Sequence, residues 1–151
     1  MAERAALSQH NKDDARERGW PAAWQDGDGC PAALEIVLLE DDVMLRAAMA
    51  LALQRQGLVV HAMGAAEQVR RMLGDNAAIV GIIMEIGLGD GEGLSFLNEL
   101  KKAWPRMAIV VLTGRPDLLL GHAMGPLETY LLKPCPMQRL ATTIRGLIAK
   151  R

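Results

Sequence analysis

Three acidic side chains follow apolar runs of the sequence, where a polar site is most easily built. Glu40 and Asp41 come directly after the run from Ile36 to Leu39, and Glu85 comes after the run from Ile79 to Met84. If both runs are strands of one parallel sheet, the three carboxylates leave it at the same edge and converge within a few ångströms. A hard dication such as Mg²⁺ relieves the repulsion between them, because it takes carboxylate and phosphate oxygens as ligands. The acids therefore predict a pocket that attracts a cation.

A hydroxyl and an ammonium group follow two later apolar runs. Thr113 comes after the run from Met107 to Leu112, and Lys133 comes after the run from Thr129 to Leu132. A threonine hydroxyl can donate a hydrogen bond to an anionic oxygen, and a lysine neutralises a carboxylate or a phosphoryl group. Each residue alone has an ordinary explanation as a strand end or a turn. Together with the acids, they predict one polar site at the carboxyl edge of the sheet.

Strand-like and helix-like segments alternate along most of the chain, which predicts an α/β domain with a doubly wound parallel sheet. Right-handed crossovers give five parallel strands in the order 2-1-3-4-5. We expect strands near 35–39, 58–62, 78–84, 107–112 and 129–132, and helices near 42–56, 65–73, 94–104 and 136–149. A fourth helix, between 117 and 124, is interrupted by Gly121 and bounded by Gly125 and Pro126, so we expect it to be short, frayed or mobile.

Composition divides the chain into a polar N-terminal tail, residues 1–33, and one domain, residues 34–151. Half of the residues are hydrophobic, which is enough for one compact core. The tail has the composition of a weakly helical or disordered segment. It contains Trp20 and Trp24, which either dock on their own domain, stay loosely ordered or bind a partner.

Charge and hydropathy argue against several classes of partner. The chain has 17 basic and 18 acidic residues and no basic block of the kind that neutralises a nucleic-acid backbone. Its longest apolar run, Ala77 to Met84, is too short to span a membrane, and the N-terminus lacks the apolar segment of a signal peptide. The cysteines and histidines have no zinc-ligand spacing. We therefore expect a cytoplasmic protein without direct nucleic-acid or membrane contact.

The polar residues resemble the receiver domain of bacterial two-component response regulators. The features that carry the resemblance are the acidic pair Glu40 and Asp41, the acid after the third strand, Thr113, and Lys133 followed by Pro134. The resemblance extends over the whole predicted domain. It implies a signalling domain and not an enzyme, with a histidine kinase, a phosphotransfer protein or another response regulator as partner. It also allows a homodimer through the fourth helix, the fifth strand and the fifth helix.

The resemblance further implies how the acidic pocket would bind a metal. Asp41 and the phosphoacceptor would be direct ligands of Mg²⁺, and Glu40 would be a ligand through a water molecule. The backbone carbonyl of Gly87 would be another ligand. Asp42 has the simplest explanation, as the N-cap of the first helix.

The residues after the fourth and fifth strands also take roles from the resemblance. Thr113 would donate its hydroxyl to a phosphoryl oxygen, beside the small Gly114 that leaves space for the incoming group. Tyr130 matches an aromatic position that swings between exposed and buried states as that threonine moves. Lys133 would pair with the acceptor and then with the phosphoryl group, and the bond between Lys133 and Pro134 would be cis.

Glu85 departs from the family pattern, which has an aspartate at the position that receives the phosphoryl group. One extra methylene brings the carboxylate closer to Thr113 and Lys133, and misplacing a nucleophile by about 1 Å can reduce its rate on the order of a hundredfold. We therefore predict poor phosphorylation, a direct ion pair between Glu85 and Lys133, and at most weak Mg²⁺ binding. Gly89, where the family usually has proline, is a second departure.

These features predict a stand-alone pseudo-receiver that acts by protein–protein contacts, because the segment before Leu34 is too short and too polar for an output domain. An ordinary receiver whose aspartate was replaced by engineering, as a phosphomimic or a block, is the alternative. Whether Glu85 mimics the active state stays open. Two enzyme classes are remote alternatives, because a flavodoxin-like protein needs a Ser/Thr/Gly-rich loop after the first strand and an aspartate-nucleophile phosphatase needs Asp-x-Asp there.

Overall fold

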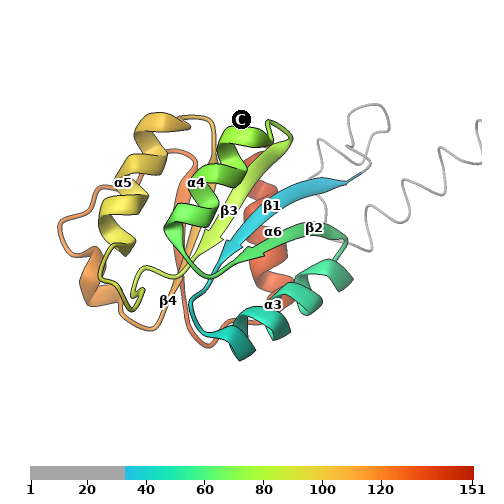
Figure 1. Ribbon diagram of the computed structural model, residues 1–151, viewed down its shortest axis with the longest axis horizontal. Helices are drawn as coiled ribbons and strands as arrows, with labels where there is room; N and C mark the ends of the chain where they lie inside the picture. The colour runs from blue at the N-terminus through green and yellow to red at the C-terminus, as the bar shows by residue number, and fades with distance from the viewer. Residues whose placement is uncertain (1–32) are drawn as a thin grey trace, which may run out of the picture.

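Five apolar segments pair side by side as a parallel sheet in the order β2-β1-β3-β4-β5 (Figure 1). The computed structural model describes residues 33–151. The strands are β1 (Leu34–Leu39), β2 (Leu58–Met63), β3 (Ile79–Met84), β4 (Ala108–Thr113) and β5 (Glu128–Leu132). The fold class and strand order predicted from the sequence are confirmed.

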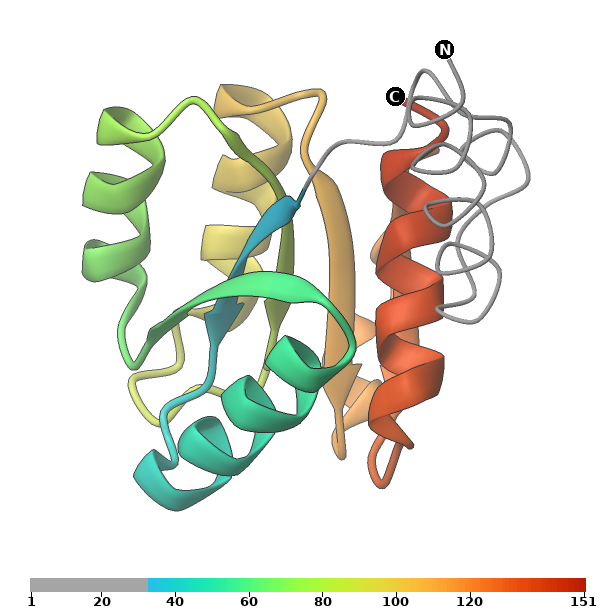
Figure 2. The same ribbon diagram turned by 90° about the vertical axis from the view of Figure 1, so that its right-hand side faces the viewer.

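Helices cover both faces of the sheet. On one face lie α4 (Ala66–Asp75) and α5 (Gly93–Ala103), and on the other lie α3 (Val43–Arg55) and α6 (Met137–Ile148) (Figure 2). These bounds differ from the predicted ones by at most two residues at each end. Because successive side chains of a strand point to opposite faces, the sheet separates two buried apolar clusters. The first packs under α4 and α5 and the second under α3 and α6.

Local sequence signals determine where the helices near the carboxyl edge of the sheet begin and end. The Asp42 carboxylate accepts the backbone N–H of Leu45 at 2.9 Å, which caps α3 as predicted. Gly57 ends that helix with φ of 86°, a value that favours glycine. The first residue of α5, Gly93, packs so closely on Ile86 that a Cβ atom there would lie 1.8 Å from the Ile86 carbonyl oxygen. Only glycine fits that position.

The segment between β4 and β5 differs from the predicted fourth helix. It contains one 3-10 turn, η1 (Pro116–Leu119), and continues without regular structure to β5. Pro116 starts the turn, and Gly121, with φ of 77°, cannot extend it as a right-handed helix. The element is short, as expected, but the predicted bounds of 117–124 are wrong. Any homodimer contact on this face would use a loop in place of a regular fourth helix.

The tail predicted for residues 1–33, with Trp20 and Trp24, lies outside the described residues except for its last position. It therefore stays a prediction. Between residues 33 and 151, none of the helices combines the length and the apolar character needed to cross a bilayer.

Candidate functional site

The predicted site residues lie at the carboxyl ends of four neighbouring strands. Glu40 follows β1, Glu85 follows β3, Thr113 ends β4 and Lys133 follows β5. Backbone hydrogen bonds extend the strand pairing into this edge, since the Glu85 N–H donates to the Leu39 carbonyl at 3.0 Å and the Lys133 N–H donates to the Thr113 carbonyl at 3.0 Å. The sheet therefore fixes the spacing of the side chains.

Lys133 is the centre of the site. Its ammonium nitrogen Nζ lies 2.7 Å from Glu85 Oε2 and 2.9 Å from Glu40 Oε2, so it pairs with two buried carboxylates at once. Burial lowers the pKa of Lys133, but the hydrogen bonds and charges of Glu85 and Glu40 outweigh it and raise the pKa above its usual value. The predicted contact between Glu85 and Lys133 is confirmed, and the peptide bond between Lys133 and Pro134 is cis.

The second oxygen of each buried carboxylate is bound by a backbone amide. Gly87 donates its N–H to Glu85 Oε1 at 2.8 Å, and Asp42 donates its N–H to Glu40 Oε1 at 3.2 Å. Gly87 thus contacts Glu85 through its N–H, and the role of its carbonyl as a metal ligand stays a prediction. All four carboxylate oxygens of Glu40 and Glu85 accept a hydrogen bond from the protein.

Asp41 does not pair with Lys133 but binds the loop after β3, and its side chain also interacts with that of Glu40. Its Oδ2 atom accepts the Gly89 N–H at 2.8 Å, and this bond is the main cause that lowers the pKa of Asp41. The side chain is exposed, unlike that of Glu40. The expected convergence of three carboxylates is therefore incomplete, because Glu40 and Glu85 meet at Lys133 and Asp41 does not.

This arrangement is a poor fit for a Mg²⁺ ion. Among residues 33–151, no three His, Cys, Asp or Glu side chains are grouped as metal ligands. Mg²⁺ requires near-octahedral oxygen ligands and gives up its water reluctantly. Here Lys133 neutralises Glu40 and Glu85, and the Gly89 amide holds Asp41, so a metal would have to displace donors that the protein supplies.

The residues expected to contact a phosphoryl group lie beside the ion pair without joining it. Thr113 is fully buried, and its hydroxyl oxygen accepts the Arg115 N–H at 2.9 Å. In the described part of the chain, no hydrogen bond connects Thr113 to Glu85. Gly114 is exposed, and no heavy atom lies within 4 Å of the place where its Cβ would be. The side chain of Tyr130, in β5, points toward solvent, and 46% of the residue's surface is exposed.

Sequence reasoning missed two features of the site. The first is the sharing of Lys133, which we had assigned to Glu85 alone. The second is Arg46, whose Nη1 donates to the Glu40 carbonyl oxygen at 2.8 Å and ties the first turns of α3 to the acidic loop. The residue in the sequence that relates to Arg46 is Gly64. A Cβ at Gly64 would lie 2.4 Å from Arg46 Nη1, so a glycine there leaves room for the arginine side chain.

Comparisons with known proteins agree with the fold that carries this site. Residues 36–145 match the model of the response regulator receiver domain. The transcriptional regulatory protein PmrA of Pectobacterium parmentieri is 28% identical over 120 residues, which cover 78% of this chain and 53% of PmrA. The transcriptional regulatory protein BasR of Escherichia coli (strain K12) is 27% identical over 120 residues with the same coverage. The chain therefore spans about half the length of these relatives.

Solved structures show the same fold. A response regulator receiver domain protein from Clostridium thermocellum superposes with a TM-score of 0.69 at 26% identity, covering 78% of this chain and 95% of that one. A receiver protein from Sinorhizobium medicae WSM419 gives a TM-score of 0.68 at 25% identity, again over 78% and 95% of the two chains. The family match extends over well more than half of the sequence, and the chain belongs to the response regulator receiver domain family, whose members are signalling domains.

Proposed function

We propose that this chain is a pseudo-receiver of a bacterial two-component or phosphorelay system, with Glu85 at the position of the phosphoacceptor. In this function the domain transmits a signal by protein–protein contacts and does not accept a phosphoryl group. The observation that carries the proposal is the double contact of Lys133, 2.7 Å from Glu85 and 2.9 Å from Glu40. Pairing of this lysine with the acceptor is expected of any receiver, but here Glu40 also pairs with Lys133, so two carboxylates neutralise it.

The chemistry of acyl phosphate formation supports this proposal. A carboxylate attacks phosphorus through one free oxygen in line with the leaving group, and that requires near-attack geometry. Both oxygens of Glu85 are engaged, one by the Gly87 N–H and one by Lys133. The extra methylene also shifts the nucleophilic oxygen by roughly the 1 Å that can reduce a rate a hundredfold. Glu85 is therefore a poor acceptor on two grounds.

Weak Mg²⁺ binding is part of the proposal. In receivers that bind the ion, Mg²⁺ neutralises negative charge on the transferred phosphoryl group. Here Asp41, Glu40 and Glu85 are the side chains that would hold it, but protein donors already bind each of them. We expect binding at millimolar concentrations or weaker.

Glu85 is only a partial mimic of a phosphorylated acceptor. Its single negative charge is spread over two oxygens, whereas a phosphoryl group carries roughly −1.5 to −2 over three. Thr113, which would contact a phosphoryl oxygen, bonds to the Arg115 N–H, and Tyr130 is exposed. These features favour a resting arrangement held by Glu85 and Lys133 over imitation of the phosphorylated state.

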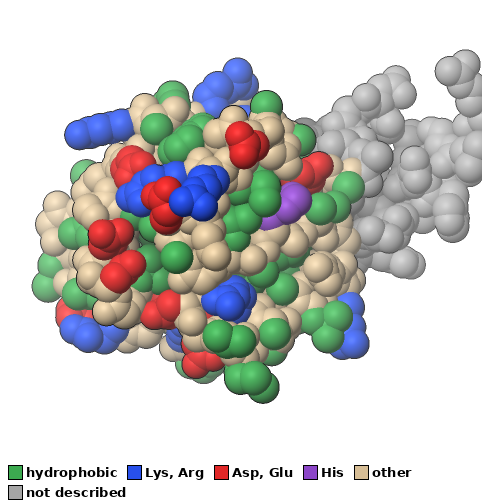
Figure 3. All heavy atoms as spheres, in the orientation of Figure 1, with side chains coloured by type: hydrophobic (Ala, Val, Ile, Leu, Met, Phe, Trp, Pro, Cys, Tyr) green, Lys and Arg blue, Asp and Glu red, His purple; other side chains and the backbone are tan. Residues whose placement is uncertain are grey.

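An apolar surface next to the site supports a function by protein contacts. Val43 and Met44, in the first turn of α3, are 64% and 80% exposed. The proposed partners are a histidine kinase, a phosphotransfer protein or another response regulator, with the homodimer described above as a further contact. On the face drawn in Figure 3, Lys and Arg side chains are interspersed with Asp and Glu and form no basic stripe. We therefore propose that this domain acts in the cytoplasm without contacting nucleic acid or membranes directly.

Phosphorylation by acetyl phosphate tests the proposal. The full chain is incubated with acetyl phosphate and Mg²⁺, and the phosphoryl adduct is measured and located by mass spectrometry. We expect no adduct on the unmodified chain and an adduct at position 85 in Glu85→Asp. The double variant Glu85→Asp with Asp41→Asn is the matched control, since it restores the acceptor but removes a metal ligand. It should lose most of the signal.

Two results would contradict the proposal. An adduct on Glu85 of the unmodified chain would show that the longer side chain is a working acceptor. A folded Glu85→Asp variant that binds Mg²⁺ but stays unmodified would show that the glutamate at position 85 is not what prevents phosphorylation.

A further inference from the structure

A separate pocket lies at the opposite edge of the sheet from Glu85. It has a volume of about 350 Å³ and is formed where α4 and α5 end and where β3 and β4 begin. Because β3 runs from Ile79 to Met84 at about 3.3 Å per residue, roughly 20 Å separate this pocket from Glu85. We call it the Trp104 pocket. The residues that matter here are Leu73, Ile79, Trp104, Arg106, Met107 and Arg151.

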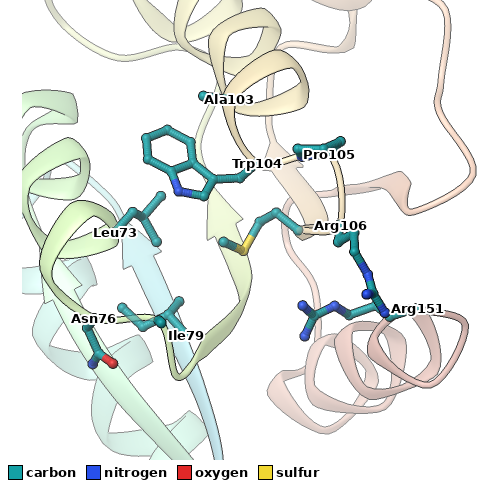
Figure 4. A pocket seen from close by; sticks show the side chains of 10 residues that line it. Leu73, Asn76, Ile79, Ala103, Trp104, Pro105, Arg106 and Arg151 are labelled. Carbon is teal, nitrogen blue, oxygen red and sulfur yellow. The ribbon is translucent and has the colours of Figure 1, made fainter.

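One side of the Trp104 pocket is apolar. Leu73, Ile79 and Met107 belong to the buried core and are each no more than 6% exposed, and Trp104 packs partly buried against the same core. Figure 4 shows the indole ring of Trp104 above Leu73 and Ile79. An indole beside aliphatic side chains is a good surface for an aromatic or aliphatic molecule. The volume falls in the range of small-molecule sites, about 300 to 1,000 Å³.

The other side of the pocket carries two positive charges. Arg106 and Arg151 are exposed, and Figure 4 shows Arg151 reaching toward the pocket with Arg106 beside it. Within residues 33–151, neither arginine forms an ion pair. Partial burial is the main cause that lowers the pKa of Arg151, and the charge of Arg106 lowers it further. Two guanidinium groups that repel each other would be stabilised by an anion between them.

An acidic side chain near the pocket already has other partners. Glu35, next to Ile79 in the strand pairing, accepts hydrogen bonds at 3.0 Å from Asn76 Nδ2 and from the His61 ring. Asn76, which also lines the pocket, is held by that contact. The described residues therefore supply an apolar surface and two arginines, and none of their carboxylates forms an ion pair with either arginine.

We propose that the Trp104 pocket binds an amphipathic anion, whose carboxylate or phosphate is held by Arg106 and Arg151 and whose aromatic or aliphatic body packs on Trp104. Arginine pairs favour such groups because the guanidinium donors match two oxygens at once. The pocket shares no residue with the acidic site, so the proposal is independent of whether Glu85 accepts phosphate.

Two sources can supply this chemistry. One is a small molecule from solution. The other is the chain itself, because Trp24 is followed closely by Asp26 and Asp28, and the chain enters β1 beside Ile79. Both sources present an aromatic or apolar group together with a carboxylate. The experiment below separates them.

Titration of the full chain with 2-naphthoate, followed by the NMR signal of the Trp104 indole N–H, tests the proposal. The signal is assigned with Trp104→Phe, and neutral 2-naphthalenemethanol is the matched probe without charge. We expect 2-naphthoate to shift the Trp104 signal and to bind about tenfold more tightly than the neutral probe. The double variant Arg106→Gln with Arg151→Gln should remove this preference. Lys102→Gln, which removes an exposed charge outside the pocket, should keep it.

The source is identified with Asp26→Asn combined with Asp28→Asn in the full chain. If the chain's own carboxylates occupy the pocket, 2-naphthoate binds several-fold more tightly to this variant. If the ligand comes from solution, the affinity for 2-naphthoate is unchanged. The proposal is wrong if neither the unmodified chain nor this variant shows a Trp104 shift, or if the charged and neutral probes bind equally to both.

Discussion

Gly89 donates its backbone N–H to Asp41 Oδ2 at 2.8 Å, which joins the loop after β3 to the loop after β1. A proline at this position, which the resemblance to receiver domains led us to expect, would have no N–H to donate. Glycine therefore gives Asp41 a partner within the protein. Gly89 lies in the same pocket as Glu85, whose Oε2 atom pairs with Lys133. In both cases, the protein itself supplies the partner of a carboxylate that the proposed function counts among the weak metal ligands.

The first prediction concerns Mg²⁺. We expect Gly89→Pro to bind Mg²⁺ about fivefold more tightly than the unmodified chain, since losing one hydrogen bond to Asp41 frees about 1 kcal/mol. Gly89→Ala is the control because it keeps the N–H, although its Cβ would lie 3.2 Å from Asp41 Oδ2. Calorimetry is the measurement, since Trp104 lies at the opposite edge of the sheet and cannot report on the site. Saturation of the unmodified chain at micromolar Mg²⁺ would refute the prediction.

The second prediction concerns the shared lysine. Lys133→Met leaves Glu40 and Glu85 buried without a cation and should lower the free energy of unfolding by about 3 kcal/mol near pH 7. Adding Glu85→Gln should recover part of this loss, because it removes one of the two negative charges that repel each other. Urea unfolding of the two variants, with Lys102→Gln as surface control, measures both effects. Equal stability of Lys133→Met and the unmodified chain would show that the ion pairs contribute nothing.

The pH dependence of the lysine contribution follows from its pKa. Glu85 and Glu40 raise the pKa of Lys133 in the folded state against the effect of burial. The stabilisation is therefore fully present below the unfolded pKa, about 10.4, and is lost as the pH rises through the folded pKa. The difference between Lys133→Met and the unmodified chain should stay constant at neutral pH and shrink only in strongly alkaline solution.

The third prediction compares the effect of alanine on stability at two glycines. A Cβ at Gly93 would collide with the Ile86 carbonyl oxygen at 1.8 Å, so Gly93→Ala must move the start of α5. We expect a loss of about 2 to 4 kcal/mol in the free energy of unfolding. Gly74, in α4, has no atom within 4 Å of its Cβ position. Gly74→Ala should therefore stabilise the protein by about 0.5 to 1 kcal/mol. Thermal unfolding distinguishes these opposite signs.

The fourth prediction concerns Glu128, which fastens the loop before β5. Its buried carboxylate accepts hydrogen bonds from the Gly125 N–H at 2.9 Å and the His122 ring at 2.6 Å, and lies 2.9 Å from Lys101 Nζ. Burial raises the pKa of Glu128, but these partners outweigh it and lower the pKa below its usual value. Glu128→Gln should lose about 1 to 3 kcal/mol of stability near pH 7.

The contribution of Glu128 to stability depends on pH with the opposite sign to that of Lys133. A lowered folded pKa stabilises the protein above the unfolded pKa, about 4.3, and the stabilisation is lost as the pH falls through the folded pKa. The unmodified chain and Glu128→Gln should therefore approach each other in stability below about pH 4. Asp117→Asn is the control, since the exposed pair of Asp117 with Arg115 should contribute little to stability at any pH. A gap that persists in acid would contradict the prediction.

The sequence by itself determined the fold and the edge at which the site is built. Apolar runs such as Ile79 to Met84 are long enough for buried strands, and their alternation with amphipathic helices leaves few topologies for a parallel sheet. The residue that follows each strand then falls at the carboxyl edge, so position together with the resemblance to receiver domains singled out Glu40, Glu85, Thr113 and Lys133.

Tertiary structure decided how the side chains at that edge are paired. A long flexible lysine can reach any of several acids, and only the packing of β1, β3 and β5 places Lys133 between Glu85 and Glu40. The same is true of Asp41, whose partner Gly89 lies 48 residues away in the chain. The Trp104 pocket also depends on where two helices end, and Arg106 and Arg151 meet there only after folding. The spacing of apolar residues in the sequence shows the periodicity of strands and helices. Which distant side chains pair depends on distances that only the packed sheet defines.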